Sequence, residues 1–299
     1  MYSKKIIKIA IENVKTGEVK TIEGLKVSAI IEQCVGMQRG SGTIQVWGID
    51  DNDMYQLTTR GTNPDAHMGD KVTLWAGDNK KNLEIALVST ISEAIGDYNP
   101  SPENMFVIQC LNGQDLALSA PDPESKQGEQ DVRGLLETLA TEAGYEFQPF
   151  GAWQLTAENP YLTGSALERF QKLCGNNGLK YVIGKGAIQV YQADSEIADA
   201  LGEIEVSFDS PDYTLLRSPR HTGMILELTI RFNPRVQIGQ TVNLKSTLKS
   251  AVGAWQIKRA THDIQSFIPD GLWETHLTCD RYLIAGDLNA AESEQQNNV

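Results

Sequence analysis

Two stretches of this chain, far apart in the sequence, share one layout of β-prone segments. In each, a glycine-centred turn opens a short Val-x-Leu strand, a long strand follows, and a hairpin partner ends in cysteine. If this is a true repeat, the chain contains two related β units. Because identities are few, two unrelated antiparallel meanders would give the same outline. The first stretch comprises His67–Leu74, Leu83–Ile91 and Phe106–Cys110, and the second comprises Gln237–Leu244, Trp255–His262 and Thr275–Cys279.

The residues before position 120 are strongly β-prone. Ile7, Ile9 and Ile11 alternate with less apolar residues, and Thr43–Ile49 lies between a glycine-rich turn and an acidic turn. A period of two is typical of a half-buried strand. Turn signals recur at the spacing expected of a sandwich or barrel, and Met54–Leu57 is expected to form a short helical turn.

The middle of the chain changes character at a proline-rich polar stretch, Pro121–Lys126, which indicates a linker. A helix is expected from Val132 to Ala143, with Asp131 as its N-cap and Gly144 beyond its end. A second helix is expected from Ser165 to Cys174. The remaining signals complete a small α+β unit: a Ser165/Glu168 capping box, Gly175 as a helix stop, and a hairpin around Gly184–Gly186.

Composition limits the classes of function. The chain has 26 basic and 39 acidic residues, a formal charge of −13, which argues against a non-specific nucleic-acid binder unless a local basic patch exists. Its four cysteines, Cys34, Cys110, Cys174 and Cys279, form no C-x-x-C pair, so free thiols are expected. Neither a signal peptide nor a membrane-spanning run is expected.

A family resemblance is carried mainly by the second stretch. Ile238–Leu244, Gly253–Ile264 and Gly271–Leu277 include the patterns Trp-x-Ile, His-x-Ile and Gly-x-Trp-x-Thr-x-Leu. Thr43–Ile49 adds a strand of the first unit, although the family often has Asn-Leu where this chain has Gly48-Ile49. The chain resembles, over nearly its whole length, the baseplate hub proteins of contractile-tailed phages and the late-control proteins of related injection systems.

The resemblance implies an α+β, mainly β fold with four parts. Two tail-tube-like antiparallel β-barrel domains are expected at 1–120 and 204–287, an α+β insert at 121–203, and a flexible tail at 288–299.

It also implies a structural baseplate hub subunit of the virion tail, assembled in the bacterial host cytoplasm. A homotrimer would place six similar barrels in a ring that joins the hexameric tail tube to a trimeric central spike. The implied partners are the tail tube protein, the spike protein and other baseplate proteins. DNA would pass through the lumen during genome ejection without specific binding, which suits an acidic surface.

No catalytic, cofactor-binding or metal-binding residue is predicted. G-x-S-x-G and H-E-x-x-H are absent from the sequence. Gly178–Gly186 has one residue too many for a phosphate loop, and Gly186 stands where Ser or Thr would bind magnesium. His262, His276 and Asp263 are too few for a metal site unless other ligands converge, and His276 is expected on the surface.

Two other classes of function stay open from the sequence. A tail-tip carbohydrate- or receptor-binding module would expose tryptophans, whereas Trp47, Trp255 and Trp273 lie in strands and are expected to be core or interface anchors. A cell-wall hydrolase would need a carboxylate pair at a defined separation. Candidate carboxylates are Asp50, Asp51, Asp53, Glu203, Glu205 and Asp209.

Overall fold

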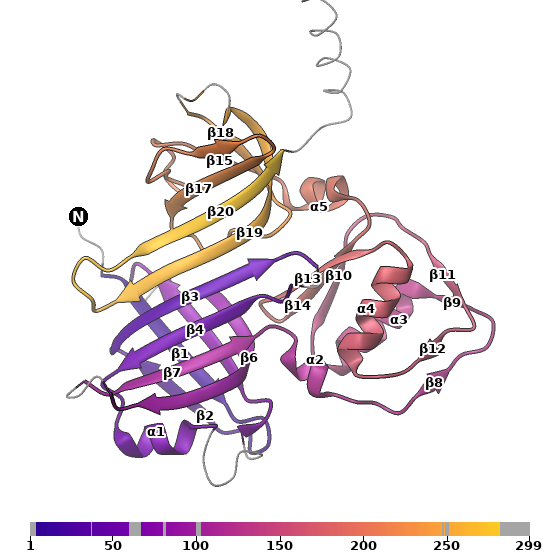
Figure 1. The fold of residues 1–299 in the computed structure, drawn as a ribbon, viewed down its shortest axis with the longest axis horizontal. Helices are drawn as coiled ribbons and strands as arrows, with labels where there is room; N and C mark the ends of the chain where they lie inside the picture. Colours follow the sequence, from indigo (N-terminus) through magenta and orange to yellow (C-terminus); the bar gives the residue numbers. More distant parts are fainter. Residues whose placement is uncertain are drawn as a thin grey trace, which may run out of the picture.

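The computed structural model describes residues 4–36, 38–59, 67–79, 82–99, 103–246, 248 and 251–281. Most strands belong to one 13-stranded sheet with the order β16-β17-β20-β19-β3-β4-β7-β6-β5-β1-β2, to which β18 and β15 attach beside β19 (Figure 1). The N-terminal strands are β1 (Ile6–Glu12), β2 (Val19–Glu23), β3 (Lys26–Cys34), β4 (Ser41–Trp47), β5 (Lys71–Gly77), β6 (Glu84–Asp97) and β7 (Met105–Leu111). The C-terminal strands are β15 (Glu203–Val206), β16 (Arg220–Thr222), β17 (Ile225–Arg231), β18 (Thr241–Leu244), β19 (Gly253–Ser266) and β20 (Trp273–Arg281).

The prediction of a mainly β, antiparallel fold is confirmed, but the described strands close no barrel. Instead, β3 pairs with β19 from Arg259↔Cys34 to Ser266↔Val27, so that one sheet runs through both ends of the chain. A closed barrel has no edge strand, whereas this sheet has ends at β16 and β2. Because β3 bonds to a strand of the second unit, the edge that could have closed the first unit is already occupied.

The repeat seen in the sequence is a repeat of structure. β5-β6-β7 and β18-β19-β20 are both antiparallel meanders whose long strands each have 14 residues. A bulge interrupts each long strand beside its cysteine partner, at Ile91↔Cys110 in one unit and at Ile257↔Cys279 in the other. The opening glycines have the same left-handed conformation, with φ of 89° at both Gly69 and Gly239.

The equivalence extends to further strands. Both β4 and β17 lie beside the hairpin partner, and β3 and β16 lie outside them in the same antiparallel sense. The units differ in strand direction at one place: β15 runs parallel to β18, whereas β1 runs antiparallel to β5. The first unit also has β2 and a short helix, α1 (Asp51–Leu57), where the sequence predicted a helical turn.

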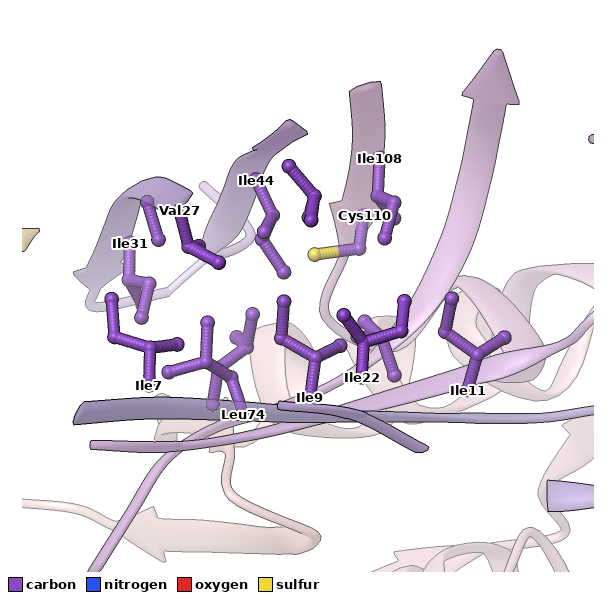
Figure 2. Packing of buried hydrophobic residues seen from close by; sticks show 14 of the residues in the cluster. Ile7, Ile9, Ile11, Ile22, Val27, Ile31, Ile44, Leu74, Ile108 and Cys110 are labelled. Carbon is purple, nitrogen blue, oxygen red and sulfur yellow. The ribbon is translucent and has the colours of Figure 1, made fainter. Parts of the chain in front are cut away.

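The core of the N-terminal unit lies between two layers of its own curled sheet. Figure 2 shows Ile7, Ile9 and Ile11 of β1 pointing toward Ile31, Ile44 and neighbouring residues of the opposite layer. All five are at most 3% exposed. The period-two alternation read in β1 therefore places every second side chain in this core.

The C-terminal unit has its own core around Trp255. This side chain is 1% exposed, and its indole Nε1 donates to the carbonyl oxygen of Ala251 at 2.8 Å. Burying a large aromatic ring with its N–H satisfied avoids the cost of an unpaired donor. The predicted role of Trp255 as a core anchor is confirmed.

The α+β insert contains helices and short sheets beside the large sheet. Its helices are α2 (Gln114–Leu118), α3 (Val132–Glu142), α4 (Ala166–Asn176) and α5 (Asp194–Leu201). Its strands are β8 (Glu124–Ser125), β9 (Glu129–Asp131), β10 (Glu146–Pro149), β11 (Thr156–Glu158), β12 (Tyr161–Leu162), β13 (Lys180–Gly184) and β14 (Ala187–Tyr191). No helix among the described residues combines the length and hydrophobicity that a membrane crossing requires.

The predicted helix caps of the insert are confirmed. Asp131 accepts from the backbone N–H groups of Arg133 and Gly134, and Ser165 forms a reciprocal capping box with Glu168. α4 continues through Asn176 rather than stopping at Gly175, because the C-cap Asn177 donates its N–H to the last turn. All four cysteines are free, as expected. The expected flexible tail at 288–299 lies outside the described residues.

Removing the cap of α4 tests how far the local signals stabilise the insert. We expect Ser165→Ala to lower the free energy of unfolding by about 1 kcal/mol, because the N–H of Glu168 loses its acceptor. Denaturant unfolding followed by circular dichroism measures this. Glu168→Gln is the matched control, since glutamine retains the capping box. Equal stability of Ser165→Ala and the parent chain would contradict the prediction.

Candidate assembly surface

One face of the large sheet is not covered by another layer formed by the described residues. Figure 1 shows β17, β20, β19, β3, β4, β7 and β6 side by side in front, with β1 behind them. Along β3, Val27, Ala29 and Ile31 are buried on the core side, so the alternate residues point to the uncovered face. We call this face, from β16 across to the second half of β6, the outer face.

The outer face is polar and more acidic than basic. Rows of side chains cross it from strand to strand, as in Arg231↔Glu274↔Asp263↔Ile30↔Thr43, which spans both units. Its acidic members in the described strands are Glu32, Glu93, Asp97, Glu227, Asp263, Glu274 and Asp280. Its basic members are Lys26, Arg220, Arg231 and Arg259. The face therefore presents an acidic surface to whatever lies against it.

Glu274 is the most buried carboxylate on this face. Arg217 holds it through two contacts of 2.8 Å from one Nη2 to both carboxylate oxygens, and His276 Nε2 lies 3.5 Å from Oε1. On the next strand, partial burial raises the pKa of Asp263; the charge of Glu274 adds to this rise, and His276 opposes it. Like charges on facing strand residues repel, and the guanidinium of Arg217 places a positive charge beside this pair.

The outer face has an open edge in each unit. At one end of the sheet, β16 pairs only with β17 in the described residues. In the other unit, β6 pairs with β5 up to Thr90 and with β7 from Thr90 to Asp97. Beyond Thr90, the side of β6 away from β7 contacts Thr59, which bonds to both the N–H and the carbonyl oxygen of Ala94. Open sheet edges are ready sites for pairing with another chain.

The insert contacts the C-terminal unit through a hairpin tip and the N-terminal unit through β13, where Asn112 Nδ2 donates to the carbonyl oxygen of Ile183. Lys185, at the β13–β14 turn, donates from Nζ to the carbonyl oxygen of Pro234 in the C-terminal unit. Nearby, Arg235 of that unit forms a bidentate pair with Glu84 of the N-terminal unit. Burial lowers the pKa of Lys185 to about 8, and Glu84 opposes this shift. These groups line a polar cleft of about 480 Å³ where the three parts of the chain meet.

The two histidines considered from the sequence have opposite environments. His276 is part-exposed on the outer face, as expected, and its Nδ1 lies 3.2 Å from the hydroxyl of Thr229. His262 is completely buried on the core side, where Nδ1 lies 2.8 Å from the hydroxyl of Thr275. Its ring packs edge-on against Phe232. Because adjacent strand residues alternate faces, His262 and Asp263 point to opposite sides of the sheet.

Four of the five tryptophans have a cationic side chain over one face of the ring. Lysine ammonium groups lie over three of them: Lys26 over Trp47, Lys8 over Trp75 and Lys5 over Trp273, at 4.8, 5.2 and 5.8 Å from the ring centroids. Trp153 is buried and faces Arg133. These rings are engaged in cation–π contacts within the chain. A sugar-stacking platform would need such faces open to solvent.

The acidic runs have local structural contacts. Asp50 caps α1 through the N–H of Asn52, Asp53 pairs with Lys20 at 2.7 Å, and Glu205 pairs with Lys245 at 2.5 Å. In the part of the chain that the structure describes, no three His, Cys, Asp or Glu side chains are grouped so as to hold a metal ion. The sequence did not single out Arg220 or Asp97, which lie on the open edges. The short alternation Arg220-His221-Thr222 before Gly223 is a local strand signal for Arg220 alone.

Comparison of the sequence with known proteins gives no relative. No protein-family model matches the chain, and no curated protein is similar to it. Comparison of the fold is informative, because many solved structures match.

Three of the similar structures come from phage tails or a related secretion machine. A tail protein from Neisseria meningitidis MC58 has a TM-score of 0.64 and 9% identity, covering 93% of this chain and 96% of that one. The 43 kDa tail protein of prophage MuSo2 from Shewanella oneidensis has a TM-score of 0.59 and 10% identity, and the match covers 92% of this chain and 96% of that one. The E. coli c3393 protein has a TM-score of 0.61 and 12% identity, and the match covers 87% of this chain and 74% of that one. That protein is described as a type VI secretion component structurally similar to the T4 tail proteins gp27 and gp5.

These matches confirm the resemblance seen in the sequence at the level of the fold. The structural neighbours of the chain are tail proteins and a type VI secretion component that resembles tail proteins, and the chain shares their fold. At these identities the similarity establishes architecture and not activity.

The buried imidazole of His262 makes stability depend on pH. Burial, with a smaller effect of Lys185, lowers its pKa to about 3, far below the value of roughly 6.5 in an unfolded chain. The unfolded state therefore binds more protons between these values. The contribution of neutral His262 is fully present above roughly pH 6.5 and is lost as the pH falls toward 3.

We expect His262→Leu to flatten the loss of stability between pH 7 and pH 5 by up to about 1.4 kcal/mol per pH unit at the lower end. Urea unfolding at several pH values measures the slope. His276→Asn, which changes a part-exposed histidine, should leave the slope nearly unchanged. A parent chain whose slope matches that of His262→Leu would show that His262 is not the titrating group.

Proposed function

We propose that this chain is a structural baseplate hub subunit of a phage-type tail. Three copies would form a ring that joins the tail tube to the central spike and surrounds the channel for DNA ejection. The chain would act in the tail baseplate of the virion after assembly in the bacterial host cytoplasm. This role is non-enzymatic. Its partners would be the tail tube protein, the spike protein and other baseplate proteins.

The observation that carries the proposal is the head-to-tail join of two equivalent units within one chain. β3 of the first unit pairs with β19 of the second, and the units share strand order and bulge position. A contact between different edges of similar units is heterologous, and heterologous contacts generate rings when the rotation closes. Three chains would contribute six such units, which suits a junction between threefold and sixfold components.

The acidic outer face supports the proposed channel. The face is continuous across both units. Asp263 and Glu274 lie in one cross-strand row, and Glu32 lies in the next row on the same side, opposite Thr261. A surface of this sign repels phosphate groups, so DNA could slide past without binding. Within this proposal, residues 1–120 and 204–287 are the ring-forming units and 121–203 is a peripheral insert.

The two alternative functions have less support. A tail-tip carbohydrate-binding module would use open tryptophan faces, and the tryptophans bearing lysine contacts have theirs occupied. A cell-wall hydrolase would need an acid and a base in one cleft. Three of the six carboxylates named from the sequence have structural contacts instead: Asp50 caps α1, Asp53 pairs with Lys20, and Glu205 pairs with Lys245.

Oligomeric state tests the proposal directly. We expect native mass spectrometry of the purified chain, alone or mixed with a candidate tube or spike subunit, to give a trimer. Negative-stain images should show rings with a central opening. The same mixture without this chain is the control and should contain no assembly of the trimer's mass. A chain that remains monomeric alone and in both mixtures would contradict the hub assignment.

A further inference from the structure

The junction inside the chain gives a reference for a contact between chains. β3 and β19 lie antiparallel, with Ile31 opposite His262 and Ile30 opposite Asp263. Each member of this pair has an equivalent strand in the other unit, and in the described structure that equivalent strand has an edge without a partner strand. The equivalent of β19 is β6, and the equivalent of β3 is β16.

The repeated bulge fixes which residues correspond along β6 and β19. Ile91 and Ile257 both face the cysteine of their hairpin partner, and the register resumes at Glu93 in one unit and Arg259 in the other. Counting onward from that point, Gly96 occupies the place of His262. By the same count, Asp97 occupies the place of Asp263.

The same reasoning applies to β16 and β3. Thr43 and Glu227 are equivalent because each lies opposite the residue that precedes the hairpin cysteine, Gln109 or Thr278. Thr43 pairs with Ile30, and Glu227 pairs with Arg220. Arg220 therefore occupies the place of Ile30.

We infer that β16 of one subunit pairs antiparallel with β6 of the next, with His221 opposite Gly96 and Arg220 opposite Asp97. This inference rests on the proposed function, because it names the contact that closes the ring. The occupant of both open edges is a second copy of this chain. The contact repeats the internal β3–β19 junction, so all six junctions of a trimer would share one register.

The backbone of β6 directs hydrogen-bonding groups toward the side on which such a partner would lie. Ala94 directs its N–H and carbonyl oxygen away from β7, toward Thr59. Since strand residues two apart direct these groups to the same side, Gly96 presents its own groups to the same edge. Ala94 would lie opposite Gly223, where β16 has already turned into β17. Thr59 therefore bonds to β6 at Ala94, whereas the incoming strand would pair with β6 at Gly96 and Asp97.

The side chains at this register have complementary charge. Arg220 is 77% exposed, and its guanidinium makes one long contact of 3.3 Å with Glu227. Asp97 accepts at Oδ1 from the N–H of Asn99. Opposite charges on facing residues stabilise a strand pair, and like charges destabilise it. At the turn beside β16, Met224 is 55% exposed and Ile225 44% exposed, which leaves apolar surface for a neighbour to bury.

Disulfide trapping tests the register. Arg220 and Asp97 would form a non-hydrogen-bonded pair with Cα atoms roughly 4.5 Å apart, within the range for a disulfide. In a Cys34→Ser background, the full chain carrying Asp97→Cys and Arg220→Cys should give cross-linked species that end at the trimer on a non-reducing gel. Each single variant is a control. A second control pairs Asp97→Cys with Glu227→Cys, one strand further away.

Charge reversal provides an independent readout. Arg220→Glu should weaken trimer formation by roughly two- to fivefold per interface, and adding Asp97→Arg should restore it. The outcomes separate the two proposals. A native trimer with no specific 97–220 cross-link and no rescue would overturn this pairing and leave the ring intact. Neither trimer nor cross-link, with or without tube and spike subunits, would overturn the hub assignment as well. Equal cross-linking in the 97–227 control would also overturn the pairing.

Discussion

The architecture depends on the backbone pairing between β3 and β19. This pairing joins strands that are more than half the chain apart in sequence and converts two units into one sheet. It also satisfies the backbone groups of a β3 edge that would otherwise stay open to solvent or to another chain. Because the join is made between unlike edges of similar units, it leaves one unlike edge open in each unit of the described chain, at β16 and along the second half of β6. These two edges are the basis of the proposed ring.

The region around the join is held by buried polar groups as well as by backbone bonds. His262 lies on β19 at the join and is fully buried. Its Nδ1 lies beside the hydroxyl of Thr275, its ring packs edge-to-face with Phe232, and its Nε2 has no hydrogen-bond partner among the described residues. The hairpin tip at Lys185 and the pair between Arg235 and Glu84 connect all three parts of the chain nearby. Buried polar groups with specific partners favour one arrangement over alternatives, although each is costly if left unpaired.

The repeat shows how local geometry is preserved while sequence identity is low. Gly69 and Gly239 share a left-handed conformation that residues with a Cβ rarely adopt, and each precedes a short Val-x-Leu strand. Next to the bulges, Cys110 and Cys279 are both buried. These few positions carry steric requirements, and the other positions need only alternate between apolar and polar. This explains why the fold resembles those of tail proteins at identities near 10%.

The sequence by itself determined the local elements: the alternation of β1, the caps at Asp131 and Ser165, the hairpin at Gly184–Gly186 and the repeated meander. Each depends on residues close together in the chain, so its physical signal is local. Only the tertiary structure decided that the units share one sheet rather than closing as barrels, that His262 is buried, and that Arg220 and Asp97 lie on open edges. Strand pairing between distant segments leaves no periodic trace in either segment, because every strand edge offers the same backbone groups to any partner.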